Sequence, residues 1–296
     1  MKNLFLNPRL FFVTLWSSRL FHFVPDRIFL QIKYFLIFGK RLNLETPQTF
    51  NEKIQWLKLY GRKPEHTQMV DKYEVRKYIE GKIGKEYLIP LFGVWDNFDD
   101  IDFDSLPNKF VLKANHFSGG VFICKDKQNF NIKKVRQEMN KILKRNYYFY
   151  GREWPYKNVR PRIIAEEYMI DESGIELKDY KIHCYNGEPK IIQVDFNRFF
   201  GQHKRNFYSI DWVYQPFSLL YPTCPEKTIT RPQSLGLMLV LAKKLSQGIP
   251  YVRVDLYSII EKIYFGELTF YHGGGYDKSD PPEWNNILGS WLNIPL

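Results

Sequence analysis

The strongest constraint on the fold is a pair of adjacent strands predicted within Tyr251–Phe270, YVRVDLYSIIEKIYFGELTF. The first strand alternates around Arg253 and Asp255, a short turn follows at 258–262, and the second strand carries Glu267. Side chains alternate between the two faces of a strand, so Asp255 and Glu267 converge if the strands pair. Two carboxylates in an apolar ribbon are costly to bury without a cation. Magnesium, which prefers oxygen ligands, would account for them, whereas exposure to water or pairing with Arg253 is the alternative.

The composition is that of a globular chain with an anionic partner. A chain of 296 residues makes one large domain or two small ones, and a hydrophobic share of 44% supplies a core. The net charge of +11 indicates a nucleotide, an acidic polysaccharide, an anionic membrane or nucleic acid, without choosing among them. The cysteines lie far apart and form no CxxC, which argues against a disulfide scaffold or a zinc ribbon and suits a reducing cytosol.

Residues 1–45 are predicted to form an amphipathic segment. Leu4–Phe38 is rich in Phe, Leu and Ile, but charged residues interrupt it before any apolar run reaches the roughly 18 residues of a spanning helix. No small-residue cleavage site follows an apolar core. Basic residues between aromatic ones are typical of helices on an anionic membrane surface, and a helical cap packed on the domain is the alternative. We expect a cytoplasmic protein, peripheral on the inner face of the cytoplasmic membrane.

Helices and antiparallel hairpins alternate in blocks along the rest of the chain, which favours an α+β fold. Helices are predicted at 52–60, with Thr49 or Asn51 as the N-cap, and at 67–80, 131–147 and 232–247. Strands are predicted at 109–114, 121–125 and 162–169, and a hairpin of 179–185 and 189–196 turns at Asn186-Gly187. Residues 90–103, which contain several acids, are expected to form a loop.

Two strand ends carry residues suited to a nucleotide. Lys113 precedes the turn Ser118-Gly119-Gly120, so an ammonium and free backbone N–H groups can face phosphates. The stretch matches neither a Walker A loop nor GxGxxG, and a tight turn also uses glycine for its conformation. Glu166 and Glu167 end another strand, where they would contact a ribose or an adenine amino group, or face water.

Two further patterns are weaker. Lys181 shares a strand face with Asp179 and would reach a phosphate there, although a cross-strand ion pair of little energy also fits. Asp102-Phe103-Asp104 formally matches the DxD of sugar-nucleotide transferases. Because it lies in an acid-rich stretch before Pro107 and the pattern is short, we interpret it as a solvated turn.

The order of these parts resembles the ATP-grasp enzymes, and the match narrows to the TupA-like ATP-grasp family, associated with teichuronopeptide and other surface-polysaccharide synthesis. The segments that carry the resemblance are TPQTFNEKIQWLKLY (46–60), DKYEVRKYI (71–79), KFVLKANHFSGG (109–120), DYKIHCYNGEPKI (179–191), RVDLY (253–257) and KIYFGELTFYHGGGY (262–276). The resemblance implies two α+β lobes that clasp ATP between antiparallel sheets. The lysine and glycine loop would lie in 46–160, and the metal site in the C-terminal lobe, 161–296.

The resemblance also implies roles for individual residues. Those matching nucleotide contacts are Arg76, Lys113, Ser118, Gly119, Gly120, Glu166 and Glu167. Asp255 and Glu267 match the magnesium ligands, while Lys181 and Arg253 would offset charge on the transferring phosphoryl group. Thr269 stands where the family pattern usually has an asparagine, so the third metal ligand would be a hydroxyl, a weaker donor than an amide carbonyl.

The resemblance implies an ATP- and Mg²⁺-dependent carboxylate–amine ligase that forms an amide through an acyl phosphate. The carboxylate would belong to a uronic acid of a bacterial surface glycan or glycolipid, such as a capsule or O-antigen, and the amine to an amino acid; no nucleic acid partner is expected. One alternative is a glycosyltransferase, which only Asp102 and Asp104 support. Another is a non-catalytic ATP-binding subunit of a membrane assembly complex. Binding of ATP rather than a sugar nucleotide, and turnover of ATP, would separate the three.

Overall fold

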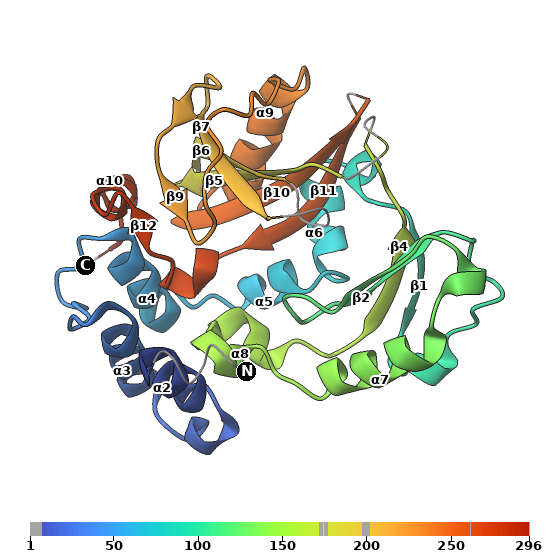
Figure 1. The fold of residues 1–296 in the computed structure, drawn as a ribbon, viewed down its shortest axis with the longest axis horizontal. Coiled ribbons are helices and arrows are strands. Elements are labelled where there is room, and N and C mark those ends of the chain that lie inside the picture. Colours follow the sequence, from blue (N-terminus) through green and yellow to red (C-terminus); the bar gives the residue numbers. More distant parts are fainter. Residues whose placement is uncertain (1–7, 172–173, 175–176, 197–201, 261, 296) are drawn as a thin grey trace.

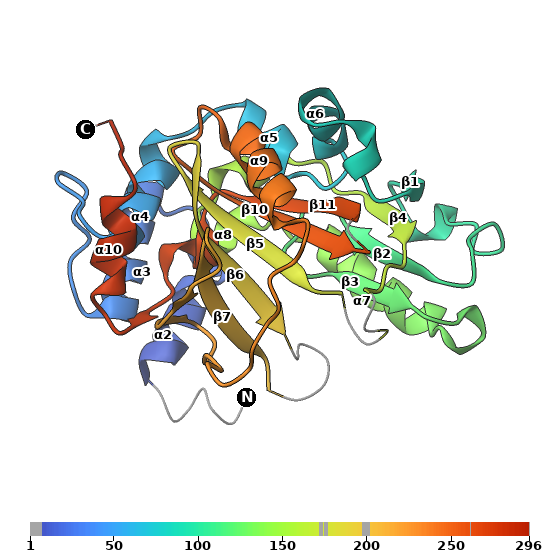
Figure 2. The ribbon, with the colours of Figure 1, turned by 90° about the horizontal axis from the view of Figure 1, so that it is seen from above.

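Two antiparallel sheets organise the chain in the computed structural model, which describes residues 8–171, 174, 177–196, 202–260 and 262–295 (Figures 1 and 2). The helices are α2 (Pro8–Trp16), α3 (Asp26–Phe38), α4 (Phe50–Tyr60), α5 (Glu65–Val70), α6 (Val75–Lys82), α7 (Ile132–Leu143), α8 (Tyr148–Gly151), α9 (Leu235–Ser246) and α10 (Trp284–Ser290). Short 3₁₀ turns are η1 (Arg19–Phe21), η2 (Lys85–Tyr87), η3 (Phe98–Asp100), η4 (Lys127–Asn129), η5 (Trp154–Asn158) and η6 (His272–Gly275).

The smaller sheet has the strand order β1-β4-β2-β3. Its strands are β1 (Leu91–Trp95), β2 (Phe110–Ala114), β3 (Val121–Cys124) and β4 (Ile163–Glu167). Helix α7 covers it, with Val135 and Met139 buried in one core with Phe110 and Leu112. The expectation of a loop at 90–103 was wrong, because the apolar LFGVW segment pairs with β4 as an edge strand.

The larger sheet has the order β11-β10-β5-β6-β7-β8. Its strands are β5 (Asp179–Tyr185), β6 (Glu188–Phe196), β7 (Lys204–Ser209), β8 (Tyr214–Gln215), β10 (Tyr251–Ile259) and β11 (Lys262–Thr269); β9 (Ser218–Leu219) and β12 (Ser279–Asp280) pair separately. Along β10, Val254 and its apolar neighbours join the core that contains α9. The alternate residues Arg253 and Asp255 therefore lie on the opposite face of the sheet.

Two hairpins of the larger sheet follow the predicted local chemistry. Asn186 and Gly187 both have positive φ, 52° and 82°, as a type I′ turn requires. The ribbon of β10 and β11 places Asp255 directly opposite Glu267. The register shifts after Asp255, so Gly266 is the extra residue of a β-bulge on β11.

The helix predicted at 67–80 is interrupted and forms α5 and α6. The Asp71 carboxylate accepts hydrogen bonds from the N–H groups of Tyr73 (2.8 Å) and Glu74 (3.2 Å), a local bond that competes with continuous helix. The helix predicted at 131–147 ends earlier, at Leu143, and begins after an Asn131 cap. Thr49 and Glu52 form the capping box of α4.

The described part of the N-terminal segment both packs on the domain and exposes apolar surface. Phe29, Leu30 and Tyr34 of α3 are buried together with Leu42 and Leu44. The start of the predicted amphipathic stretch, residues 4–7, lies outside the described residues. Among those described, no helix is both long enough and apolar enough to span a bilayer.

Candidate active site

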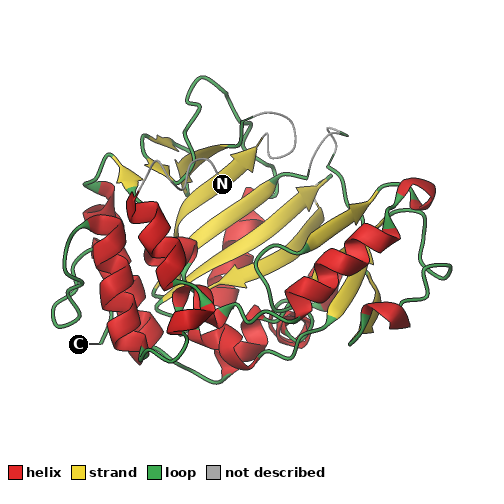
Figure 3. Cartoon of the chain, turned by 60° about the horizontal axis from the view of Figure 1, so that its bottom comes forward, coloured by secondary structure: helices red, strands yellow, loops and turns green. Residues whose placement is uncertain are grey.

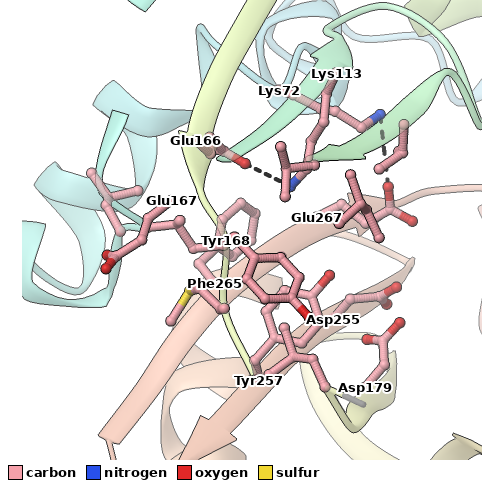
Figure 4. Close-up of a pocket in the computed structure, with 18 of the residues that line it drawn as sticks. Lys72, Lys113, Glu166, Glu167, Tyr168, Asp179, Asp255, Tyr257, Phe265 and Glu267 are labelled. Carbon is pink, nitrogen blue, oxygen red and sulfur yellow. Dashed lines mark hydrogen bonds and ion pairs between the residues drawn. The ribbon is translucent and has the colours of Figure 1, made fainter. Parts of the chain in front are cut away.

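A pocket of about 450 Å³ lies between the two sheets and is lined by residues of both (Figure 4). A cavity of this size is in the usual range for small-molecule and cofactor sites. The small sheet contributes Lys113 and Glu166, and the large sheet contributes Asp255 and Glu267. The pocket therefore brings together residues that are up to 195 positions apart in the sequence, from Lys72 to Glu267.

On the small sheet, an ion-pair cluster surrounds Glu166. Lys113 on β2 and Glu166 on β4 are diagonal neighbours on one face. The Lys113 Nζ donates to Glu166 Oε2 at 2.6 Å, and Arg76 on α6 lies 3.4 Å from Oε1. Glu167 also lines the pocket but is exposed (Figure 4). The three predicted groups Arg76, Lys113 and Glu166 thus meet on one wall.

The glycine turn joins β2 to β3 beside Lys113. Ser118 and Gly119 line the pocket, whereas Gly120 does not. Gly119 and Gly120 have φ of 92° and 64°, a left-handed conformation that glycine adopts without strain. A Cβ at Gly120 would also lie 3.1 Å from the Ile142 side chain, so this glycine serves the packing of the turn on α7.

On the large sheet, Asp255 is 1% exposed and bonds to two cations. Its oxygens accept hydrogen bonds from Arg253 Nε and Nη2, both at 2.6 Å, and from Lys181 Nζ at 2.5 Å. Lys181 pairs with Asp179 as well, and both line the pocket. Arg253 does not line the pocket; it lies behind Asp255 and also bonds to His272 Nδ1 at 2.9 Å.

Glu267 is the carboxylate of this pair with room for a ligand, because 39% of its side chain is exposed. Lys72 Nζ lies 3.9 Å from it, and Arg253 Nη2 lies 3.2 Å from it. Removal from water alone would raise the pKa of Glu267, but Lys72, Arg253 and Lys181 together hold that pKa below its usual value. Glu267 is therefore ionised at neutral pH and faces the pocket (Figure 4).

The donors present fit a magnesium ion that arrives with a nucleotide. Among the described residues, no three His, Cys, Asp or Glu side chains form a ready metal cluster. Magnesium usually takes one or two carboxylates and completes its shell with water and phosphate oxygens, which suits the facing pair Asp255 and Glu267. Thr269 does not line the pocket, and its Oγ1 is 3.5 Å from Glu267 Oε1. It orients Glu267 rather than reaching the cavity.

Sequence reasoning missed Lys72 and the apolar wall of the pocket. Lys72 donates to the Phe117 carbonyl at 3.0 Å, so it links the glycine turn to Glu267. Burial lowers the pKa of Lys72, and Glu267 opposes that change. The apolar lining comes from Val75, Leu88, Ile89, Tyr168, Met169, Leu177, Tyr257 and Phe265. Apolar residues of these types are common in every protein core. The sequence therefore does not show that they line a pocket, and only their position in the fold does.

The DxD residues lie away from this site. Asp102 and Asp104 are both exposed, and neither lines the pocket. Asp102 Oδ1 accepts a hydrogen bond from the Asp104 N–H at 3.0 Å, which is the geometry of a local turn. This agrees with the interpretation of a solvated turn and leaves the glycosyltransferase alternative without a structural basis in the pocket.

Comparison with known families identifies the chain. A family model described as TupA-like ATPgrasp matches residues 52–293. The chain belongs to the TupA-like ATP-grasp family. The predicted family and the predicted ATP-grasp fold of class α+β are thereby confirmed. A search of curated proteins found no significant match.

The solved structures that are similar to this chain include two ligases and a RimK domain protein. D-alanine–D-alanine ligase from Bacillus anthracis, complexed with ATP, is 15% identical with a TM-score of 0.39 over 69% of this chain and 54% of the ligase. The corresponding ligase from Helicobacter pylori is 14% identical, with a TM-score of 0.42 over 82% of this chain and 69% of the other. A RimK domain protein from Sphaerobacter thermophilus is 8% identical, with a TM-score of 0.42 over 77% and 69%. The chain spans about half the length of the first of these.

Proposed function

We propose that this TupA-like ATP-grasp protein is an ATP-dependent carboxylate–amine ligase. The observation that carries the proposal is the pocket in which Lys113 and Glu166 of one sheet face Asp255 and Glu267 of the other. Cations on one wall and paired carboxylates on the other match the needs of a magnesium–triphosphate substrate. The apolar lining, including Tyr168 and Phe265, offers a dry surface for the purine.

In the reaction, the substrate carboxylate attacks the γ-phosphorus and ADP leaves, which gives an acyl phosphate. The amine then attacks the acyl carbon, the C–N bond forms, and phosphate leaves with the bonding electrons. Asp255 and Glu267 would hold the magnesium ion, which supplies charge neutralisation to the phosphates. Lys113 and Lys181 act on the charge of the transferring group, and Arg253 keeps Asp255 oriented from behind.

For the substrates, we propose a uronic acid carboxylate of a bacterial surface polysaccharide and the amine of an amino acid. This choice is supported by membership of the TupA-like family and by the basic charge of +11, which favours an acidic partner. The pocket itself selects a nucleotide rather than a particular glycan.

A screen of ATP hydrolysis tests the ligase proposal. Phosphate release should require both a uronic-acid glycan and an amino acid, and mass spectrometry should find the amide. Glu267→Gln is the matched inactive control, because it keeps the shape of the side chain and removes its charge. ATP binding without turnover, across uronic and other carboxylates, would instead support a non-catalytic subunit. Turnover of a sugar nucleotide would support a glycosyltransferase.

The N-terminal helices form a second, separate feature, and we propose that they contact an anionic membrane. Exposed large apolar side chains concentrate on α2, η1, α3 and the turn between η1 and α3: Phe11, Phe12, Leu15, Leu20, Phe23, Ile28, Ile32 and Phe35. Leu20 and Phe23 are 69% and 84% exposed. Arg19, Arg27 and Lys40 are exposed beside them. Apolar groups flanked by cations fit the interface of an anionic bilayer.

The paired substitution Leu20→Ser and Phe23→Ser tests this contact while leaving the packed face of α3 unchanged. Flotation of the variant with phosphatidylglycerol vesicles should fall well below that of the wild-type chain, and added salt should weaken the wild-type binding. Substitution of Val213 and Leu220, exposed at 61% and 65% elsewhere, by serine is the matched control. Equal flotation of all three proteins would make the N-terminal segment a structural cap alone.

A further inference from the structure

Helix α7 carries a face of lysines that the nucleotide site does not use. Its buried side, Val135 and Met139, packs against the small sheet. With 3.6 residues per turn, the opposite side presents Lys133, Lys141 and the C-cap residue Lys144, with Lys134 beside them. All four are exposed, and Glu138 is the acidic residue of the helix. One side of α7 is thus apolar and buried, and the opposite side is basic and exposed.

This lysine face lies on the same side of the molecule as the exposed apolar helices. Figure 1 places α2, α3, α8 and α7 along one side, below the smaller and the larger sheet, and Figure 3, with that side turned forward, shows helices in front of the strands. The sheet that α7 covers lies above the helix in Figure 1, so the lysine face points away from the sheet, toward that side. The helices that carry the exposed apolar side chains and the helix that carries the lysines therefore lie on the same side of the molecule.

We propose that the lysine face of α7 is a second contact with the anionic membrane surface that the N-terminal helices bind. This inference rests on the membrane contact proposed above for α2, η1 and α3. A basic amphipathic helix complements anionic headgroups, and each lysine near such a surface adds to the attraction. An anionic membrane fits better than a soluble acidic polymer, because the neighbouring helices on this side expose phenylalanine and leucine, which a hydrated polymer would not bury.

Two contacts on one side of the molecule would strengthen binding beyond either alone. Once the N-terminal helices have bound, the lysines are held near the surface at high effective concentration. The α2–α3 contact is largely apolar and the α7 contact is electrostatic, so the two respond differently to salt. Docking at both points would also set the orientation of the small sheet, which carries Lys113 and the glycine turn, relative to the membrane.

The test compares three full-length proteins on vesicles made of equal parts phosphatidylglycerol and phosphatidylcholine. One is wild type, and one carries Lys→Gln substitutions at Lys133, Lys134, Lys141 and Lys144. The control carries them at Lys82, Lys190, Lys227 and Lys244, exposed lysines on other elements that remove the same charge. At low salt the α7 variant should bind at least about tenfold more weakly than wild type, and the control should change by less than about twofold. The residual binding of the α7 variant should depend less on salt.

Each other outcome overturns the inference in a recognisable way. Equal weakening in both variants would mean that net charge alone acts. Undiminished binding of the α7 variant, with wild type still bound, would remove α7 from the interface and leave the N-terminal contact standing. No binding by wild type would remove both. Loss of binding to soluble polygalacturonate, with vesicle binding retained, would make α7 a site for an acidic polymer. Mg·ATP affinity should be the same in all three proteins, which keeps this result separate from the ligase proposal.

Discussion

Some residues of the pocket are buried and stabilise the site, and others are exposed to the cavity and can contact a substrate. Asp255 is almost fully buried and accepts hydrogen bonds from both Arg253 and Lys181, so it neutralises two buried cations. Glu267 is partly exposed and its nearest cations lie at 3.2 and 3.9 Å. The two acids face each other in register, but their loss should have different costs.

Asp255→Asn and Glu267→Gln should each lower turnover by at least about a hundredfold, because each removes charge where phosphate charge develops. Asp255→Asn should also destabilise the fold by about 3 kcal/mol, since it removes the buried anion that Arg253 and Lys181 share. Glu267→Gln should leave the unfolding free energy within about 1 kcal/mol of wild type. Urea unfolding and ATP-dependent phosphate release measure the two effects. Full turnover in Glu267→Gln would place the metal elsewhere.

Lys113→Ala should weaken Mg·ATP binding by about 1–3 kcal/mol, the usual size of a lost charge-assisted contact. Calorimetry measures the change directly. Lys109→Ala is the matched control, since Lys109 precedes the same strand and is exposed outside the pocket. Equal ATP affinities for the two variants would show that Lys113 serves only its ion pair with Glu166.

His66 should make the fold sensitive to acid. Burial lowers the pKa of His66 to about 4 from 6.5, and its ring packs at 4.2 Å against Phe270. The folded state therefore resists protonation that the unfolded chain accepts, so this contribution is present above pH 6.5 and is lost as the pH falls through 4. His66→Phe should abolish this loss. Between pH 6.5 and pH 4 the free energy of unfolding of the variant should fall by up to about 3 kcal/mol less than that of the wild type. Identical pH dependence of unfolding in both proteins would refute the assignment.

At the scale of elements, the bulge of the β10–β11 ribbon sets the geometry of the acids. Because Gly266 is the extra residue, Asp255 and Glu267 stay opposite while the strands beyond them shift register. A Cβ at Gly266 would lie 3.1 Å from the Asp255 carbonyl oxygen and 3.2 Å from the Tyr257 ring. The bulge thus needs a residue without a side chain at a point that also lines the pocket.

Gly266→Ala should lower the free energy of unfolding by about 1–3 kcal/mol and weaken ATP binding, because the backbone or Tyr257 must move. Gly236→Ala on α9, where a Cβ meets nothing within 4 Å, should stabilise the protein by up to about 1 kcal/mol and leave ATP affinity unchanged. Thermal unfolding and calorimetry on both variants make the comparison. If stability and ATP affinity change equally in Gly266→Ala and Gly236→Ala, the bulge tolerates a side chain.

Elements that are specified by neighbouring residues were predictable from the sequence. Elements that depend on a long-range strand pairing, or on a side chain that bonds the backbone in place of the helix, were not. The Asn186-Gly187 hairpin and the capping box at Thr49 follow from chemistry within a few residues. Strand β1 was missed because Gly93 and the surrounding acids resemble a loop, and its pairing with β4 is a long-range contact. The break before α6 was missed because the helical pattern continues through Asp71, whose carboxylate bonds the local backbone instead.

At the scale of the whole molecule, the sequence could predict which residues are candidates for the site, but not how the fold places them relative to one another. Strand periodicity predicted that Asp255 and Glu267 converge, and pairing within one ribbon confirms the convergence. Lys72 gave no signal, because its role depends on a turn that β2 and β3 bring from 45 residues away. Likewise, Arg253 was expected at the phosphates but lies behind Asp255, since strand alternation fixes the face of a side chain and not how far it reaches.

One buried arginine links the N-terminal helices to the rest of the domain. Arg152, after α8, is 1% exposed, and its guanidinium donates to the carbonyls of Phe21 (3.0 Å), His22 (3.3 Å) and Val24 (3.1 Å). Its Nε lies 3.6 Å from Asp26. Arg152 also has a φ of 56°, a left-handed conformation that costs energy outside glycine and is held by these surrounding contacts.

A double-mutant cycle isolates this attachment. In the full chain, Arg152→Met should cost on the order of 3 kcal/mol, because three carbonyls and Asp26 lose a charged donor. In a chain that begins at Asn43, the partners are already gone, so Arg152→Met should change the unfolding free energy by less than about 1 kcal/mol. The shortened chain keeps the family core at 52–293. Urea unfolding measures the change in unfolding free energy in both chains. An equal change in the two would mean that Arg152 stabilises α8 alone. The N-terminal helices would then be held by the apolar contacts of Phe29 and Leu30.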